Sequence, residues 1–270
     1  MMRSAFVSIC PENKRIYGVE AMDTRFWGPS SWQLFHLVAY SHPDSEMFFN
    51  NIKNILPCKF CRASTTEFME KDLPLHPRSH DIPRWLYDLH NRVNQKLREQ
   101  SKTDKAIGDP GQDPSFEEVS ERYRTFLKYS PSQLKVIPGA DFMFTLGYNY
   151  PEKPTSDQIE SHYQFWNGLL EVMPYAHLRE GYRSFVAKHP IQPALQSRST
   201  YMHWVHSLLK RLCRGKTRSY RGMCQHVGYF KSACNSPTYR GKTCRKTKDG
   251  YRKTRDNKRT FRVSHGRLIA

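Results

Sequence analysis

The sequence contains no long hydrophobic run, which argues against a membrane-spanning protein. No stretch of the 270 residues is apolar over the roughly eighteen positions that a helix needs to cross a bilayer. The N-terminal segment MMRSAFVSICPENKR also lacks the sustained apolar core of a secretory signal. We therefore expect a protein that is made on cytoplasmic ribosomes, has no membrane span and is not secreted through a signal peptide.

Strand-like alternation of polar and apolar residues is absent as well. Apolar and aromatic side chains recur instead at helical spacing, as in Trp32, Phe35, His36 and Ala39. This periodicity predicts an all-α fold. The expected helices span residues 29–41 with Pro29 in the first turn, 44–56 with Asp44 as N-cap, the cysteine pair to Pro74, 82–98 and 116–129.

Acidic residues are scarce at the C-terminal end. Residues 211–270 hold 18 Lys and Arg against two acids, so the other 210 residues hold 43 − 18 = 25 basic and 25 − 2 = 23 acidic residues. The body is nearly neutral, and the tail carries most of the net charge of +18. Basic residues interleaved with Tyr and Gly suit contact with nucleic-acid phosphates or another anionic surface. The alternative is a solvated arm that only aids solubility.

Cysteine is missing between residues 62 and 212. Upstream of this gap, Cys58 and Cys61 form a CxxC pair, which has three interpretations. A zinc site needs about four ligands, and neither a second CxxC nor an HxxxH lies nearby, so no metal is expected. A structural disulfide across two residues would close little chain entropy. A redox-active dithiol fits best. The other cysteines are Cys10, Cys213, Cys224, Cys234 and Cys244.

The setting of the pair favours redox chemistry, because Pro57 places the cysteines at the start of a helix. Unpaired N–H groups and the helix macrodipole favour a low-pKa thiolate at such a position. A thiolate can attack disulfides or pass electrons to a flavin. A thioredoxin would need a βαβ context, which this sequence lacks.

Three motifs carry a resemblance to a known family. WGPSSWQLFHLVAYSHP, PCKFCR and WLYDLHNRVNQKL follow one another within residues 24–130. In this order, within a small helical bundle, they resemble the Erv/ALR family of FAD-linked sulfhydryl oxidases. The resemblance implies an Erv-type four-helix bundle with a fifth short helix, FAD as the cofactor, and a Cys58–Cys61 disulfide that exchanges with thiols of substrate proteins.

The resemblance also implies roles for individual residues. Cys61 is expected to lie against the flavin, and Cys58 to be the exposed thiol that exchanges with substrate. A cofactor held in a bundle needs flat aromatic faces and a few polar contacts rather than a Gly-rich loop. Taken singly, each contact could be an ordinary core residue. The expected cofactor contacts besides Cys61 are Trp27, Gly28, Trp32, His36, Tyr40, His90, Asn91, Val93, Asn94, Lys96 and Tyr123.

One departure from the family pattern concerns Tyr87. Many members carry a cysteine at this position, which forms a structural disulfide with a cysteine beyond the helix. The chain has neither cysteine. We expect the loss to remove a stabilising link and to leave the chemistry intact.

Residues 142–213 resemble a degenerate repeat of the first bundle. VAYSHP (38–43) recurs as LGYNYP (146–151), and the proline before the cysteine pair recurs as Pro174. Tyr175 and Leu178 then replace the two cysteines, and His206 falls at the position of His90. If the repeat is real, the second copy kept the fold and lost the chemistry; chance similarity between helical segments is the alternative.

These patterns divide the chain into four predicted regions. They are an N-terminal extension (1–23), an FAD-binding sulfhydryl oxidase domain (24–130), a second helical domain that could be an inactive repeat (131–213), and a basic tail with cysteines (214–270). The tail cysteines could carry electrons to the active pair, form structural disulfides, or stay as thiols.

The leading hypothesis is an FAD-dependent thiol oxidase that turns two protein thiols and O2 into a disulfide and H2O2. The alternative is a basic, nucleic-acid-binding structural protein built on an inactive oxidase fold. The resemblance implies a homodimer, although a second bundle in the same chain could imitate one partner. It also points to the branch of the family found in large DNA viruses, and hence to the cytoplasm, a virus factory or the virion.

Overall fold

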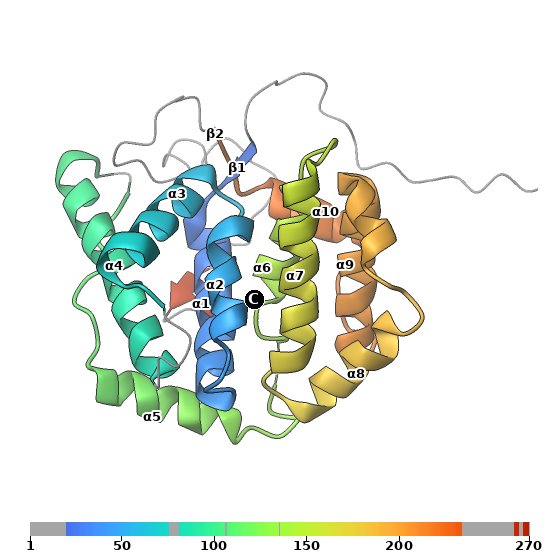
Figure 1. Cartoon of the computed structure of the whole chain (residues 1–270), viewed down its shortest axis with the longest axis horizontal. Coiled ribbons are helices and arrows are strands. Elements are labelled where there is room, and N and C mark those ends of the chain that lie inside the picture. Colours follow the sequence, from blue (N-terminus) through green and yellow to red (C-terminus); the bar gives the residue numbers. More distant parts are fainter. Residues whose placement is uncertain are drawn as a thin grey trace, which may run out of the picture.

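The computed structural model describes residues 20–75, 81–105, 107–134 and 136–233, together with the backbone of 262–264 and 267–269. These residues are mainly helical, as predicted (Figure 1). The exceptions are two short antiparallel ladders, in which β1 (Glu20–Met22) pairs with β2 (Lys231–Ala233) and β3 (Arg262–Ser264) with β4 (Arg267–Ile269). Strands of three residues are too short to show alternation, so the sequence could not indicate them.

Five α-helices form the first bundle. α4 packs on α1, α2 packs on α3, and α5 crosses the lower end of both α1 and α4 (Figure 1). This arrangement confirms the predicted bundle. The bounds are α1 (Thr24–Ser41), α2 (Glu46–Ile55), α3 (Lys59–Glu67), the π-helical turn η1 (Phe68–Asp72), α4 (Ile82–Thr103) and α5 (Phe116–Leu127).

Two helix starts differ from the prediction. α1 is capped by Asp23, whose carboxylate accepts the N–H of Arg25 at 2.9 Å, so Pro29 lies inside the helix and not in its first turn. The N-cap of α2 is Ser45 rather than Asp44. Asp and Ser are both favoured N-cap residues, so sequence alone cannot separate two adjacent candidates.

A second helical bundle follows, and the folded region extends further than predicted. Its helices are α6 (Ala140–Tyr148), α7 (Ser156–Val172), α8 (Ala176–Val186) and α9 (Arg198–Leu212), with a 3-10 turn η2 (Gln192–Gln196) before α9. Helix α10 (Tyr220–Gly228) packs on α6, although it belongs to the segment predicted as a tail. It folds there because Met223, Cys224 and Val227 are buried.

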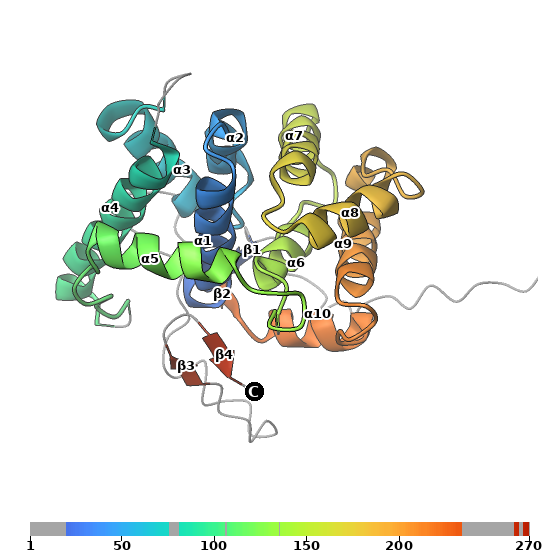
Figure 2. The ribbon, with the colours of Figure 1, turned by 90° about the horizontal axis from the view of Figure 1, so that it is seen from below.

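The two bundles pack against each other through the first two helices of each. α6 lies on α1 and α7 lies on α2, as both views show (Figures 1 and 2). At the contact of α2 with α7, the rings of Phe48 and Phe165 are 5.5 Å apart between centroids. Gly168 permits this approach, because a Cβ there would stand 3.3 Å from the ring of Phe48. One apolar core therefore runs through both bundles. Within the described ranges, no helix combines the length and the apolar character that a bilayer crossing requires.

Candidate active site

The two cysteines lie in the turn that joins α2 to α3. Leu56 ends α2 with φ −53° and ψ 138°, and Cys58 is the N-cap of α3 with φ −123° and ψ 124°. The sulfur of Cys58 accepts the backbone N–H of Cys61 at 3.4 Å. The predicted helix start after Pro57 is therefore confirmed, and Cys58 Sγ lies at the positive end of the helix macrodipole.

The structure holds both cysteines as thiols, and the proton of Cys61 is firmly held. The hydrogen bond with Cys58 is the main cause that raises the pKa of Cys61 well above its usual value, followed by burial. The cations of Lys96 and Arg62 act in the opposite direction. The expectation of a low-pKa thiolate is therefore wrong for Cys61 beside a second thiol, because the shared hydrogen bond and desolvation by neighbouring atoms outweigh the nearby cations.

The exposure of the pair is the reverse of the expectation for Cys58. The side chain of Cys58 is 0% exposed, whereas Cys61 is partly exposed. The turn is buried because it lies against the second bundle, where the amide of Asn149 donates to the carbonyl of Pro57. The motifs of the first bundle carry no information about the second bundle, which is what shields Cys58 from solvent.

Five rings gather beside α1 and form what we call the aromatic wall. Trp32, His36 and Tyr40 occupy one face of α1, His90 comes from α4, and Tyr123 comes from α5. The rings of Trp32 and His90 stack at 4.0 Å, and those of His36 and Tyr123 stack at 4.7 Å. Tyr40 lies parallel to Tyr123 at 6.1 Å, and its hydroxyl is 2.6 Å from Ser120 Oγ. Trp32 and His36, which helical spacing placed on one face, and Tyr40, which the resemblance implied, thus lie on one side of α1.

The two histidines of the aromatic wall are neutral at pH 7. His36 Nε2 and His90 Nδ1 are 3.2 Å apart, so one ring donates its proton to the other. Burial lowers the pKa of His36 well below its usual value and lowers the pKa of His90 to about 4. His36 Nδ1 is buried and has no hydrogen-bond partner within the described part of the chain. An unpartnered buried nitrogen on an aromatic surface suits a ligand with both flat rings and polar atoms.

A chain of polar contacts links α4 to the cysteine turn. Lys96 Nζ donates to Ser64 Oγ at 3.1 Å. The hydroxyl of Ser64 in turn donates to the carbonyl of Phe60 at 2.9 Å and, at the longer distance of 3.3 Å, to the carbonyl of Cys61. The ammonium of Lys96 is close enough to Cys61 to favour its thiolate. α4 therefore contributes His90 to the aromatic wall and a cation near the cysteine pair.

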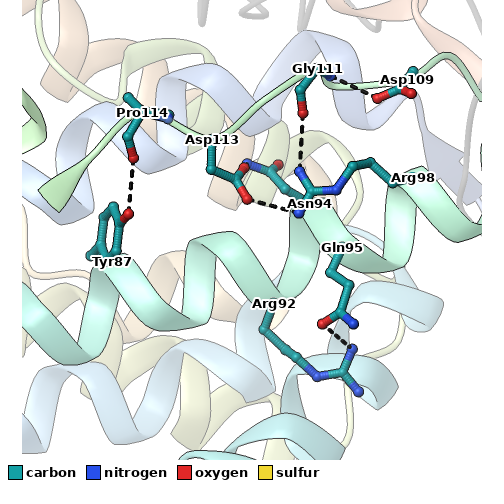
Figure 3. A network of polar contacts seen from close by, with 9 residues as sticks. All are labelled: Tyr87, Arg92, Asn94, Gln95, Arg98, Asp109, Gly111, Asp113 and Pro114. Carbon is teal, nitrogen blue, oxygen red and sulfur yellow. Dashed lines mark hydrogen bonds and ion pairs between the residues drawn. The ribbon is translucent and has the colours of Figure 1, made fainter.

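Residues 109–114 are bound to α4 by the network in Figure 3. Asn94 donates to the carboxylate of Asp113 at 2.7 Å, and Arg98 forms an ion pair with the same carboxylate at 2.8 Å (Figure 3). The hydroxyl of Tyr87 donates to the carbonyl of Pro114 at 2.9 Å. Tyr87 therefore joins α4 to the segment before α5 with a hydrogen bond, at the position where the resemblance implied a disulfide.

The other predicted cofactor residues lie elsewhere. Trp27 packs on Phe142 of α6, with ring centroids 5.9 Å apart, and so belongs to the contact between the bundles. Asn91 lines a shallow surface depression. Val93 packs at the edge of the core. A Cβ at Gly28 would meet nothing within 4 Å, so sterics do not require glycine there.

Sequence reasoning missed three residues of this region. Ser64 lies one turn after Cys61 on the same helix, so helical spacing could have identified it. Asp113 lies in an irregular segment, and Asn149 belongs to the other bundle. No sequence signal connects either residue with the pair, because their contacts join segments far apart in the chain.

The fold and this site define a helical-bundle protein with a CxxC pair at a helix start beside an aromatic wall. Residues 29–121 match the Erv1/Alr family. The mitochondrial FAD-linked sulfhydryl oxidase ERV1 of Saccharomyces cerevisiae is 29% identical over 99 residues, which cover 33% of this chain and 52% of the relative. An FAD-linked sulfhydryl oxidase of African swine fever virus (isolate Pig/Kenya/KEN-50/1950) is 29% identical over 80 residues, covering 26% and 67%.

A probable FAD-linked sulfhydryl oxidase of Acanthamoeba polyphaga mimivirus is 30% identical over 86 residues, which cover 27% of this chain and 59% of the relative. The chain thus spans between about half and two thirds of the length of these relatives. No solved structure matches the chain.

Proposed function

We propose that the chain is an FAD-dependent thiol oxidase that makes disulfides in protein substrates and uses O2 as the acceptor, releasing H2O2. The observation that carries this proposal is the link between the CxxC turn and α4 through Ser64 and Lys96. That link joins the dithiol at the start of α3 to α4, the helix that contributes His90 to the aromatic wall. The names of the similar oxidases support both the reaction and the cofactor.

The residues of the site fit FAD. The aromatic wall offers flat faces, and His36 Nδ1 offers a buried polar atom that has no partner within the described residues. Lys96 and Asn94 on α4 would supply a cation and an amide for the polar parts of the cofactor. When bound, FAD supplies an acceptor for the two electrons of the dithiol and a donor for O2.

The chain's own thiols carry the exchange with substrate. A substrate dithiol and the Cys58–Cys61 disulfide become a substrate disulfide and two enzyme thiols, so two electrons and two protons pass to the enzyme pair. We assign the exchange to Cys58 and the contact with FAD to the partly exposed Cys61. Because Cys58 is buried, the turn must open before a substrate thiol can reach it.

The test combines cofactor content with turnover. Purified protein should be yellow and should oxidise dithiothreitol with consumption of O2 and formation of H2O2. A folded preparation that stays colourless and cannot take up FAD would exclude the proposal. The matched control is Cys213→Ser in α9's C-cap, which should keep both colour and turnover, because Cys213 lies outside the site.

A spectrum can also assign the two thiols. Cys58→Ser removes the hydrogen bond that is the main cause of the raised pKa of Cys61, while Lys96 and Arg62 stay. The pKa of Cys61 should then fall, and its thiolate should give a long-wavelength absorbance band with the bound flavin. Cys61→Ser should bind FAD without that band. A band in the Cys61 variant and none in the Cys58 variant would reverse the assignment.

A second candidate function is contact with nucleic acid, and a specific surface favours it. Residues 210–221, which run from the end of α9 into α10, contain no acid. We call them the basic turn. All its cations are exposed, and none forms an ion pair within the described residues. They are Lys210, Arg211, Arg214, Lys216, Arg218 and Arg221.

The remainder of the predicted tail, including Cys234 and Cys244, lies largely outside the described residues.

Binding to labelled DNA across a salt series tests this candidate. Phosphate contacts release counterions, so affinity should fall steeply with salt, and Lys210→Gln with Arg214→Gln should reduce the slope by roughly two. Cys58→Ser should leave the affinity unchanged. An affinity that does not depend on salt or on these cations would exclude the basic turn as a nucleic-acid site.

The partners and the location stay proposals as well. We propose that the chain acts during infection by a large DNA virus, in the cytoplasm, a virus factory or the virion, which the two viral relatives support. A homodimer would need a surface other than the α6-facing side of α1 and the α7-facing side of α2, because these sides are covered within the chain.

A further inference from the structure

Two carbonyl groups upstream of Cys58 are each held by a side chain. Arg62, one turn into α3, donates to the carbonyl of Leu56 at 2.6 Å. Asn149, at the C-terminal end of α6, donates its side-chain amide to the carbonyl of Pro57. The carbonyl of Pro57 belongs to the peptide group that leads directly into Cys58. Asn149 of the second bundle thus holds the backbone next to the cysteine pair, at the carbonyl oxygen of Pro57.

The corresponding position in the first bundle makes no such contact. The match of VAYSHP with LGYNYP pairs Asn149 with Ser41. The hydroxyl of Ser41 donates to carbonyls of its own helix, at 2.7 Å to Leu37 and 3.2 Å to Val38. The hydroxyl of Ser41 finds its acceptors within its own helix, whereas the longer side chain of Asn149 reaches the other bundle. The similarity of the two bundles therefore does not account for the Asn149 contact.

We infer that Asn149 is a positioning residue that stabilises the dithiol form of the Cys58–Cys61 pair. In the observed dithiol, Cys58 Sγ accepts the N–H of Cys61 at 3.4 Å, and this geometry depends on the orientation of the peptide that Asn149 holds. A disulfide brings the two sulfurs to about 2.05 Å, closer than two hydrogen-bonded thiols, so the geometry around the pair changes. A contact made in the dithiol geometry therefore favours the reduced pair.

The inference rests on the proposed redox role of the pair, but its test reads an equilibrium and not turnover. The exchange is Cys58–Cys61 disulfide plus two glutathione thiols giving two enzyme thiols plus oxidised glutathione, which balances electrons and protons. A chain that proves inactive as an oxidase still has this equilibrium. Failure of the proposed function and failure of the inference can therefore be told apart.

The experiment compares variants of the full chain in anaerobic glutathione buffers of fixed ratio. Samples are quenched with acid and alkylated, and mass spectrometry of the peptide with Cys58 and Cys61 gives the disulfide fraction. Asn149→Ala should shift the ratio toward the disulfide by roughly three- to tenfold, the range expected for one hydrogen bond. Asn149→Asp keeps the shape but cannot donate from an ionised carboxylate, so its shift should be at least as large.

Asn51→Ala is the matched control. Asn51 in α2 also donates a side-chain amide across the contact between the bundles, to the carbonyl of Ser161 at 2.7 Å, but it does not touch the cysteine turn. It should lower the thermal midpoint about as much as Asn149→Ala and change the disulfide ratio by less than about twofold. The inference is overturned if Asn149→Ala leaves the ratio unchanged or shifts it toward the dithiol, or if Asn51→Ala shifts it equally.

Discussion

Tyr175 in the second bundle has nearly the backbone conformation of Cys58 in the first, with φ −112° and ψ 128° against φ −123° and ψ 124°. The helices before them end alike, at Met173 with φ −56° and ψ 123° and at Leu56 with φ −53° and ψ 138°. Each turn also has its first helical hydrogen bond at 2.9 Å, from Arg179 and from Arg62. These likenesses support our proposal that residues 131–213 are a repeat of the first bundle.

The chemistry differs completely between the two turns. The sequence match pairs Trp32 with Ala140 and His36 with Phe144, so the second bundle has no aromatic wall of this kind at its first helix. His206, at the position of His90, instead reaches the carbonyl of Arg218 and the ring of Tyr220 near the surface. A fold of this kind does not need these reactive side chains for its stability, which comes from apolar packing.

The contact between the bundles resembles a two-fold dimer interface within one chain. Phe48 and Phe165 occupy the same place relative to Pro57 and Pro174, and they touch each other. A residue meets its own counterpart in this way near a two-fold axis. The second bundle covers one side of α1 and of α2, and it reaches the cysteine turn through Asn149.

Single substitutions at the two turns should give the largest difference in thiol oxidase turnover. Cys58→Ser should reduce thiol oxidase turnover by about a thousandfold or more, because the exchanging thiol is gone. Tyr175→Phe removes only the hydrogen bond from its hydroxyl to the carbonyl of Phe126, at 2.7 Å, and should leave turnover unchanged. Oxygen consumption with dithiothreitol checks both. Equal losses in the two variants would contradict the assignment of the chemistry to the first turn.

Restoring the cysteines of the second turn should restore a disulfide and no activity. Tyr175→Cys with Leu178→Cys, made in a Cys58→Ser background, places thiols on a backbone like that of the first turn. Both replaced side chains are buried, so unfolding free energy should fall by roughly 3–6 kcal/mol. Mass spectrometry should detect the new disulfide under oxidising conditions. Recovery of oxidase turnover would show that the aromatic wall is not required.

Buried polar contacts should matter more in the second bundle than in the first. Trp166 Nε1 donates to the hydroxyl of Tyr201 at 2.5 Å, and His162 Nδ1 lies 2.9 Å from the same oxygen. Tyr201→Phe leaves Trp166 Nε1 buried without a partner and should cost roughly 2–3 kcal/mol. Tyr40→Phe loses one half-buried contact, with Ser120, and should cost about 1 kcal/mol. Urea unfolding measures the loss of stability in each variant. A larger loss in Tyr40→Phe than in Tyr201→Phe would contradict the prediction.

Acid should destabilise both bundles through their buried histidines. Burial lowers the pKa of His162 to about 3 and holds the pKa of His36 well below its usual value. A lowered folded-state pKa means that the stability is present above about pH 6.5 and is lost as pH falls toward the folded value. At pH 5 the loss from His162 should be roughly 2 kcal/mol.

The thermal midpoint measured from pH 7 to pH 5 checks this sign. Asp141 opposes it, because burial raises the pKa of its carboxyl to about 6, and its contribution is lost as pH rises through that value. His162→Gln should flatten the dependence on pH in part, and His36→Gln should flatten it further. A midpoint that is constant or rises toward pH 5 would mean that these histidines are charged in the folded chain.

Much of the first bundle follows from local sequence. Ser115 and Glu118 form a capping box, and Pro83 lies in the first turn of α4, so the starts of α5 and α4 could be predicted within a residue. The CxxC turn follows from Pro57, and the spacing of Trp32, His36 and Tyr40 places them on one face of α1. These features depend on backbone preferences and helical periodicity, which act over a few residues.

The tertiary structure alone decided how the redox pair behaves. Neither the burial of Cys58 nor the raised pKa of Cys61 can be read from CKFC, because solvent exclusion depends on what packs against the turn. The Asn149 contact and the β1–β2 ladder likewise join segments separated by most of the chain or by a whole bundle. A sequence determines which residues can react, but the desolvation and hydrogen bonds that set their pKa values and their access arise only when distant segments meet.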